Sequence, residues 1–591
     1  MTGAVRATGV FLFLAAFSPG CLFIAAVIPA AEEPVSCDPS DPACTIEGVT
    51  GETGVTGPTN MVVPAGAIGD PCANDGACTS LFCDGTMRCA AAPTDTCPAA
   101  PRDPLAPVLF FTDLVSGPNS GGEDNLGVFI TIYGERFGAT AGTVLINGAP
   151  VAKIKEWTPD SGAARGIDRI VVQPGSSVTS GNLVVIVAGR VSNPLPFTVR
   201  SGRIFLLDPA STAATATGSF SEPFKTLSAA KSVLAAGDTV YIKDGVFDTR
   251  DPDSIGVGRN TYLYLSRSNY PATTPQTPVA IVGYPGHRPT FGPPTFPPAL
   301  ADCMGGTTAV SIEPDNSQYV QHLVFAHLNL KNSSLLLAAT GNGLRFVDLV
   351  FDTECAHFHF GDPQANTGWL LGSNFHGTGP VTSMITLESY GTSTIRDIEL
   401  GWNENDDTAD CFWLFGANQQ GSSTIQNITI HDNLVRKGFR LASFQNNVQN
   451  IAFYNNVALD TGPWLPDDFT GTATLTHNSF FGVERLFSFV GVKAAMTHVV
   501  SNNIFALTNG AVVSADNNVF SGASNLWRNQ AIPPFDATGF SDAPGFVDAT
   551  IGDLRLQPAS PARARGAQTT RCATFDGVRR PTSSAPDVGA Y

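Results

Sequence analysis

A short repeat in the second half of the chain constrains its fold more than any other feature. Four strand-like runs each end on an asparagine, at steps of 23, 22 and 25 residues: Asn433, Asn456, Asn478 and Asn503. A fixed period in the low twenties is typical of a solenoid, in which coils of three short strands stack at about 4.8 Å. Like residues then lie above one another, and the asparagines are expected to form a hydrogen-bonded ladder. Because an isolated coil cannot bury its inner face, the stack should fold as one unit.

The composition favours a turn-rich β protein and excludes several classes of function. The 591 residues include 59 glycines and 43 prolines, and 43% are hydrophobic against 14% charged, which argues against a disordered or coiled-coil protein. The length predicts two to four domains. With a net charge of -18, the body should repel nucleic acid and anionic lipid, so neither is expected as a partner. Looser echoes of the repeat occur at 323–330 and 516–519.

The N-terminus has the features of an export signal, assigned to residues 1–30. Arg6 precedes an apolar run that ends before Pro19 and is too short to be a good transmembrane span. The pair Gly20-Cys21 resembles the box of bacterial lipoproteins, which implies that Cys21 is acylated and becomes the mature N-terminus. Cleavage near Ala30 with plain secretion, and an uncleaved anchor, are the alternatives. Each places the body outside the cytoplasm, as an outer-membrane or cell-surface lipoprotein or a secreted protein, with membrane contact only through the N-terminal anchor.

A spacer and a small cysteine-rich segment follow. Residues 31–68 are rich in Pro, Gly, Thr and acidic residues without apolar periodicity, as in a flexible linker. Residues 69–100 are too few for a core and should depend on disulfides, and a zinc site is less favoured because no Cys-x-x-Cys pair or histidine lies there. The spacing leaves the pairing open for the seven cysteines of this part of the chain: Cys37, Cys44, Cys72, Cys78, Cys83, Cys89 and Cys97.

Four more cysteines lie in the solenoid part: Cys303, Cys355, Cys411 and Cys572. Two bridges can form among them, and Cys355 with Cys411 is one candidate pair because both flank an acidic motif. If Cys21 is acylated, an odd number of cysteines remains, which predicts at least one free thiol.

Residues 105–201 alternate short strand-like runs with glycine turns, which indicates a β-sandwich. The runs ITIYGERFG, VLINGAPV and VVIVAGRVSNPLPFTV, which begin at 130, 144 and 184, resemble an IPT/TIG domain. That resemblance implies an immunoglobulin-like spacer or binding module on a surface protein. Trp157 is expected to belong to its core rather than to a ligand platform.

Residues 203–591 carry the solenoid. A short amphipathic helix is expected within 221–236, with Leu227, Ala230, Val233 and Leu234 on one face, and a buried strand should follow at 239–242. These segments, the repeats, and the closing motifs at 543–567 and 576–591 resemble right-handed parallel β-helix proteins of the pectate-lyase type. The expected fold is therefore all-β: a right-handed parallel β-helix solenoid with an N-terminal immunoglobulin-like β-sandwich and a small disulfide-rich segment.

The strongest chemical signal is an acidic run at 403–410. Four acidic residues in seven positions repel one another unless solvated or bridged, and Ca²⁺ prefers several carboxylate oxygens. Asp406, Asp407 and Asp410 resemble the calcium triplet of polysaccharide lyase family nine. That resemblance implies a bound Ca²⁺ that neutralises a uronate carboxylate, and a lysine that abstracts the proton α to it. Lys437, beside Arg440, is the expected base.

The acidic run departs from that family in three ways. Thr408 stands where the family has glycine. A fourth aspartate is absent one coil upstream, where Thr382 lies, and Glu388 and Asp397 are inexact substitutes. Only eight of the 33 basic residues are lysines, so Lys437 and Lys493 are the lysines that follow the triplet, and the spacing to Lys437 is short. The alternative is a solvated acidic turn.

Three weaker signals remain. His357 and His359 share one side of a strand and could bind a transition metal with Asp362, although such pairs are more often surface or turn residues. The pair Asp467-Asp468 could serve a glycosidase if it faced a second carboxylate across a cleft. Three tryptophans could stack on sugars, although Trp413 can equally belong to the core: Trp402, Trp413 and Trp464.

Together these features predict an exported protein, expected to be a monomer, whose β-helix engages a uronate-containing polysaccharide and, if catalytic, cleaves it by β-elimination. A non-catalytic glycan-binding or adhesion protein of the cell envelope is the alternative, and a glycosidase-type β-helix is the third. Calcium dependence separates the lyase from the glycosidase, and activity on any glycan separates both from the adhesin.

Overall fold

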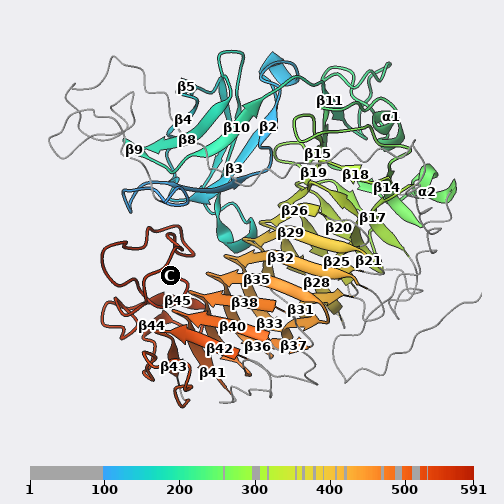
Figure 1. Ribbon diagram of the computed structural model, residues 1–591. Helices are drawn as coiled ribbons and strands as arrows, with labels where there is room; N and C mark the ends of the chain where they lie inside the picture. Colours follow the sequence, from blue (N-terminus) through green and yellow to red (C-terminus); the bar gives the residue numbers. More distant parts are fainter. Residues whose placement is uncertain are drawn as a thin grey trace, which may run out of the picture.

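The structure is a computed structural model, and it describes residues 97–591 apart from 257–259, 296–306, 316–317, 353–355, 362–365, 377–380, 390–391, 406–408, 418–421, 439, 463, 468–470, 486–495, 509–518 and 529. The export signal with Cys21, the linker, and the cysteines from Cys37 to Cys89 lie outside the described residues. Within them the structure is nearly all β (Figure 1). No described helix combines the length and hydropathy that a bilayer crossing requires.

Three parallel sheets form the body of the molecule, with 12, 11 and 8 strands among the described residues. The chain visits sheets I, II and III in turn and then returns to sheet I one coil further on. This arrangement is the predicted parallel β-helix, which is therefore confirmed.

The strands of each sheet are given in stacking order. Sheet I contains β11 (Ile204–Leu207), β12 (Thr239–Ile242), β15 (Val279–Gly283), β19 (Leu323–Ala326), β23 (Leu344–Val347), β26 (Asn366–Leu371), β29 (Thr394–Gly401), β32 (Thr424–His431), β35 (Val448–Tyr454), β38 (Gly471–Thr476), β40 (Met496–Ser501) and β42 (Val519–Ala523). Sheet II contains β13 (Val246–Phe247), β16 (Thr290–Phe291), β20 (Asn329–Lys331), β24 (Val350–Asp352), β27 (Asn374–His376), β30 (Glu404–Asn405), β33 (Leu434–Gly438), β36 (Val457–Thr461), β39 (Ser479–Val483), β41 (Ile504–Leu507) and β43 (Leu526–Arg528). Sheet III contains β14 (Thr261–Ser266), β17 (Thr308–Glu313), β21 (Leu335–Ala339), β25 (Ala356–Gly361), β28 (Val381–Ser389), β31 (Ala409–Ala417), β34 (Arg440–Gln445) and β37 (Trp464–Asp467).

The asparagine ladder runs along the corner between sheets I and II. The side-chain amide of Asn433 donates to Oδ1 of Asn456 at 2.9 Å, and that of Asn456 donates to Asn478 at 3.1 Å. The ladder starts at Asn403 and ends at Asn525, which donates to Asp536. The expected ladder is thus present, and it extends beyond the repeat to Asn403 and Asn525. Each buried amide is satisfied, so the corner holds the coils in register.

The residue before each ladder asparagine has a left-handed backbone. φ is 56° at Trp402, 53° at Asp432, 55° at Asn455, 55° at His477 and 59° at Asn502. This conformation turns the chain sharply from sheet I into sheet II. Two of these left-handed residues bond outside the coil: the side-chain amides of Asn455 and Asn502 donate to backbone carbonyls of the C-terminal segment, which comprises residues 530–591.

The β-sandwich packs against the first coils of sheet I (Figure 1). Its strands are β1 (Val108–Thr112), β3 (Ile130–Glu135), β7 (Asp168–Gln173) and β6 (Lys153–Thr158) in one sheet, and β2 (Ser116–Gly117), β10 (Leu195–Val199), β8 (Gly181–Val187), β4 (Thr143–Ile146) and β5 (Ala149–Pro150) in the other, with β9 (Arg190–Val191) paired to β8. Tyr241, Val282 and Leu371 of sheet I share one apolar cluster with Phe129 of the sandwich. The sandwich is therefore part of a continuous core. Trp157 is half-buried at its edge and donates to the Gly138 carbonyl at 2.9 Å.

A buried charge cluster lies between the sandwich and the β-helix. Nε2 of His327 lies 2.9 Å from Oδ2 of Asp113, and its Nδ1 lies 3.0 Å from Oδ2 of Asp348. Asp348 also accepts from Tyr133 at 2.7 Å and from Arg288 at 2.8 Å. Burial opposes the imidazolium, but hydrogen bonds to the two aspartates raise the pKa of His327 above its ordinary value. Because each charge is paired and hydrogen-bonded, the cluster fixes the orientation of the sandwich.

The stack ends at β43, and the C-terminal segment covers the outer side of sheet II. Its strands β44 (Phe546–Asp548) and β45 (Asp553–Leu556) pair with each other, antiparallel. The closing motif at 543–567 therefore contains the strands β44 and β45, which add no coil to the stack. Cys572 of this segment is bonded to Cys97, so it is not available to the other solenoid cysteines. Cys303 and Cys355 lie outside the described residues, and so does the side chain of Cys411.

The predicted helix is shorter than its sequence pattern. It covers α1 (Leu227–Lys231), begins at Thr226, whose side chain accepts from the Ala229 amide, and buries Ala230. Val233 lies beyond its end and is 37% exposed. The expected buried strand is β12, all four residues of which are buried. The remaining short elements are α2 (Pro252–Gly256), η2 (Glu123–Asn125), η3 (Ala164–Gly166), β18 (Val320–Gln321) and β22 (Gly341–Asn342).

Candidate functional site

In the sequence, the predicted calcium triplet follows β30 of sheet II and extends into β31 of sheet III. Asp406 and Asp407 lie outside the described residues, and Asp410 lies in β31 with its side chain outside them. Glu404, the fourth acidic residue of the run, is described: its carboxylate accepts from Nε of Arg436 at 3.3 Å and from the backbone amide of Arg165 in the sandwich. The Glu404 carboxylate is therefore already used by these two hydrogen bonds. The candidate metal ligands of the acidic run are its three aspartates, Asp406, Asp407 and Asp410.

Lys437 and Arg440 lie in the coil directly after the triplet. Asn405, which ends β30, pairs with Val435 in β33, and its side-chain amide donates to the Lys437 carbonyl at 3.4 Å. Cys411 pairs with Arg440 across β31 and β34. Lys437 is exposed, and the Arg440 side chain lies outside the described residues. The strand pairing thus places Asn405 and Cys411, which flank the triplet in sequence, in the coil next to the strands that contain Lys437 and Arg440.

The structure supplies no fourth carboxylate at the level of Asp410 among the residues it describes. Val381 and Ser383 pair with Ala409 and Cys411, so Thr382 is the residue beside Asp410 in the preceding coil. Glu388 lies six residues further along that strand, about 20 Å away at 3.3 Å per residue. Asp397 lies in sheet I and accepts from the Asn427 amide at 3.0 Å. Neither carboxylate takes the place of the missing aspartate.

Sheet III carries an ion pair on its outer side. Nε2 of His359 lies 3.0 Å from Oε2 of Glu388 in the next strand. The His357 side chain and Asp362 lie outside the described residues, so the predicted transition-metal set is not tested. No group of three or more metal-binding side chains occurs in the described part of the chain.

The three tryptophans have different environments. Trp413 is fully buried and packs edge-on against Phe453 inside the coil, so it belongs to the core and not to a sugar platform. Trp402 is half-buried and packs on Phe110 of the sandwich and on His431. The side chains of Trp464 and Asp467 lie outside the described residues, as does Asp468.

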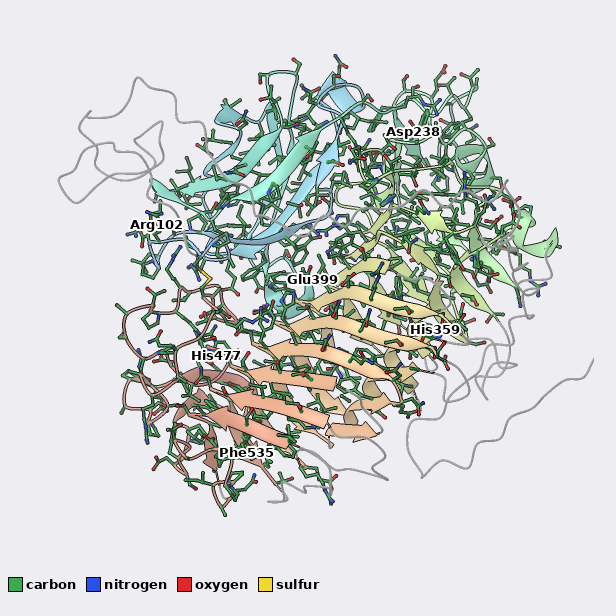
Figure 2. The ribbon with its side chains drawn as sticks, in the orientation of Figure 1. Arg102, Asp238, His359, Glu399, His477 and Phe535 are labelled. Atoms are coloured by element: carbon green, nitrogen blue, oxygen red, sulfur yellow. A yellow bond between two sulfur atoms is a disulfide. The ribbon has the colours of Figure 1, made fainter. Side chains whose placement is uncertain are left out.

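A second charge cluster lies on sheet I beside the edge of the sandwich, and the sequence did not predict it. Nδ1 of His431 lies 2.8 Å from Asp432, and its Nε2 lies 3.1 Å from Oε1 of Glu399. Figure 2 shows Glu399 on the side of the β-helix that faces the sandwich, and His359 away from it. The positions Arg345, Trp369 and Glu399 are paired in consecutive strands of sheet I. Aligning the coils on their ladder asparagines would have placed Glu399 one coil before Thr429, close to His431.

The pKa values of His431 and Glu399 are shifted away from neutrality in opposite directions. Burial alone would lower the pKa of His431, but hydrogen bonds to Asp432 and Glu399 raise it to about 9. Burial raises the pKa of Glu399, but the hydrogen bond to His431 and the charges of His431 and Arg345 bring it below its ordinary value. A general acid or base works best with a pKa near the working pH, so neither group fits that role. A cavity of about 150 Å³ beside Arg345, Glu399 and Trp402 is lined mainly by apolar residues of the sandwich edge.

No protein-family model and no curated protein matches the chain. Three solved structures that are similar in fold are pectate lyase Pel9A (13% identity, TM-score 0.46, 66% of this chain and 96% of that one), a rhamnogalacturonan lyase (11%, 0.30, 64% and 95%) and XylC in complex with xylose (9%, 0.32, 66% and 98%). The β-helix is established by the strand pairing above, and these likenesses assign no function.

Proposed function

We propose that the protein binds a uronate-containing polysaccharide at the corner between sheets II and III and cleaves it by calcium-assisted β-elimination. The observation that supports the proposal is the pairing of β30 with β33 and of β31 with β34, because the strands on either side of the acidic run lie next to those that contain Lys437 and Arg440. A metal and a base must reach one sugar for this reaction, and adjacent coils meet that requirement.

The residues present suit a hard cation. Asp406, Asp407 and Asp410 supply carboxylate oxygens, which Ca²⁺ prefers, and Thr382 places a hydroxyl-bearing residue beside Asp410. Bound Ca²⁺ would neutralise the uronate carboxylate and stabilise the enolate that develops from it.

The chain's own residues then perform the proton transfer. Lys437 takes the proton from the carbon α to the carboxylate, a carbon–carbon double bond forms, and the glycosidic carbon–oxygen bond on the β carbon breaks. The departing sugar oxygen takes up a proton from solvent, so atoms and charge balance. Arg440 holds the uronate carboxylate in place beside the base. A positioned base and a positioned carboxylate together lower the barrier more than either group alone.

The test is the ultraviolet absorbance of unsaturated uronides on polygalacturonate and on alginate, with Ca²⁺ and with a chelator. We expect a calcium-dependent rise for the wild type, and loss of that rise in Asp407→Ala and Lys437→Met. Lys225→Met, at an exposed lysine before α1, is the matched control and should retain the rise. Absence of any rise from the wild type on these uronans contradicts cleavage.

Calcium binding can be measured apart from activity. Ca²⁺ should raise the melting temperature of the wild type and leave that of Asp407→Ala unchanged, because a ligand stabilises only the state that binds it. A glycan that binds, in affinity electrophoresis, without any product would favour the non-catalytic binding protein instead.

A further inference from the structure

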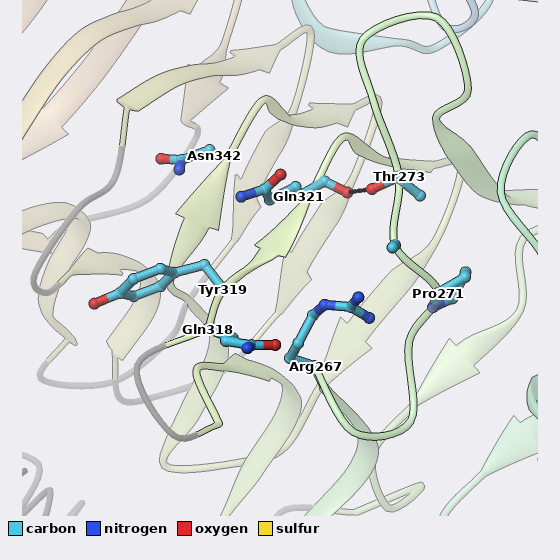
Figure 3. Close-up of a pocket in the computed structure, with 8 residues that line it drawn as sticks. Arg267, Pro271, Thr273, Gln318, Tyr319, Gln321 and Asn342 are labelled. Atoms are coloured by element: carbon cyan, nitrogen blue, oxygen red, sulfur yellow. Dashed lines mark hydrogen bonds between the residues drawn. The ribbon is translucent and has the colours of Figure 1, made fainter. Parts of the chain in front are cut away.

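A polar pocket of about 360 Å³ opens beside the corner between sheets III and I (Figure 3). It lies between the loop that follows β14 and the short strands β18 and β22. Its volume falls within the roughly 300–1,000 Å³ of small-molecule sites. Its lining is mostly polar and consists of Arg267, Pro271, Ala272, Thr273, Gln318, Tyr319, Gln321 and Asn342.

The loop side of the pocket is anchored. The Tyr270 ring is buried, and its hydroxyl donates to the His322 carbonyl at 3.2 Å. The Tyr270 carbonyl accepts from Arg267 at 2.6 Å, and the Thr273 hydroxyl donates to the Gln321 carbonyl. A site that is held in shape before binding loses less entropy when a ligand enters.

The opposite side of the pocket presents three side-chain amides and an aromatic ring. The turn from Asp315 to Gln318 is closed by two backbone hydrogen bonds of 2.9 Å, which fix Gln318 at the rim. Gln321 pairs with Asn342 in the next coil, so their amides stand one strand spacing apart, about 4.8 Å. The Tyr319 ring lies beside them.

Arg267 carries a positive charge that no carboxylate balances within the part of the chain the structure describes. Its hydrogen bond to Tyr270 uses one of five guanidinium N–H donors. Figure 3 shows the guanidinium between the Pro271 loop and the segment of Gln318 and Gln321. Because the protein as a whole has a net charge of -18 and repels anions, such a guanidinium is a site at which an anionic group can bind selectively.

We infer that this pocket binds one uronate residue of the polysaccharide. Arg267 pairs with the sugar carboxylate in the two-point geometry that guanidinium groups favour. The Gln318 and Gln321 amides bond to the ring hydroxyls, and the Tyr319 ring covers an apolar face of the sugar. The inference rests on the proposed function for the identity of the polymer, since both sites take the same sugar.

The pocket is a binding site remote from the proposed cleavage corner. It belongs to the coil of β17, four strand spacings before β31 in sheet III, which is about 19 Å along the stack. A sugar held there affects how tightly the polymer binds and leaves the reacting groups untouched. Loss of Arg267 should therefore raise KM on polygalacturonate and leave kcat unchanged.

The experiment is calorimetric titration of the full chain with trigalacturonate. Arg267→Ala should weaken binding about ten- to a hundredfold, the loss expected for a charge-assisted hydrogen bond. Gln321→Ala, a milder change whose folding the melting temperature checks, should weaken binding about two- to tenfold. Arg250→Ala removes an exposed arginine elsewhere and should bind like the wild type.

Two results would overturn the inference: equal affinities for Arg267→Ala and Arg250→Ala, or displacement of trigalacturonate by equimolar acetate, which would show that a bare carboxylate suffices. Failure of the proposed cleavage is distinguishable. If the wild type forms no unsaturated product but loses trigalacturonate binding in Arg267→Ala, then cleavage is refuted and the pocket assignment stands.

Discussion

Cys97 is bonded to Cys572 across 475 residues of sequence, so the start of the described chain and its C-terminal segment are joined covalently. The contact is reinforced by Arg579, whose guanidinium donates to the carbonyls of Cys97 at 3.0 Å and Ala100 at 2.8 Å. Arg136 of the sandwich also donates to the Asp576 carbonyl at 2.9 Å. The C-terminal segment therefore bridges the outer side of sheet II and the sandwich.

Removing this disulfide should loosen the C-terminal segment. We expect Cys572→Ser to lower the free energy of unfolding by about 2–5 kcal/mol, because a cross-link over a long loop restricts the unfolded chain. Chemical denaturation of the wild type and the variant measures the difference. Reductant should lower the stability of the wild type toward that of the variant, and equal stability of the oxidised proteins would contradict the prediction.

Protonation of His431 should make stability depend on pH. Its pKa is raised from 6.5 to about 9 in the folded protein, so its contribution is complete below pH 6.5 and is lost as the pH rises through 9. The shift corresponds to about 3 kcal/mol. Between pH 6.5 and 9, the free energy of unfolding of His431→Asn should therefore fall less than that of the wild type. Urea denaturation at several pH values in this range measures the difference.

The control for His431 is Asn450→Gly, at an exposed residue that does not titrate. This variant should keep the pH slope of the wild type. If His431→Asn and Asn450→Gly show the same slope, the charge cluster around His431 does not contribute as described.

The asparagine ladder should be sensitive at its centre. Asn456→Leu removes amide bonds to the Ile430 and Tyr454 carbonyls and leaves the Asn433 amide without its acceptor. Each buried polar group left unpaired costs about 1–3 kcal/mol, so we expect a loss of at least about 3 kcal/mol. Asn450→Gly, on the exposed side with one 3.3 Å bond and a left-handed backbone that glycine adopts freely, should cost under about 1 kcal/mol. Similar losses in both variants, measured by denaturation, would argue against the ladder's role.

The cluster around His327 should hold the sandwich on the β-helix. Asp348→Asn removes the negative charge that faces Arg288 and His327 in a buried site, and we expect a loss of about 3–5 kcal/mol. Tyr133→Phe removes the hydroxyl that donates to Asp348 and also contacts Nδ1 of His327 at 3.1 Å, and it should cost about 1–2 kcal/mol. Limited proteolysis should cut Asp348→Asn faster than Tyr133→Phe, and equal rates would contradict this role.

The ladder was predictable because its signal is local. Asn433, Asn456, Asn478 and Asn503 sit at one turn of successive coils, and the turn chemistry repeats in the sequence. The repeat in the sequence did not identify Asn403 and Asn525, which occupy the same turn and form further rungs.

The candidate site was predictable only as a list of residues. The acidic run and the scarcity of lysine identify Asp406, Asp407, Asp410 and Lys437, because these are residue types that the chemistry requires. Their adjacency depends on how many residues each corner contains, and that number varies from coil to coil. Strand pairing alone shows that Thr382, and not Glu388 or Asp397, stands beside Asp410.

The sequence by itself determined that this chain forms a stacked parallel β-helix after a β-sandwich, because periodic burial and turn residues are properties of short segments. Only the tertiary structure decided that the sandwich shares a core with sheet I, that Cys97 bonds Cys572, and that Arg267 lines a polar pocket with Gln318 and Gln321. These are contacts between segments far apart in the chain. They depend on the three-dimensional path of the coils, which no local pattern encodes.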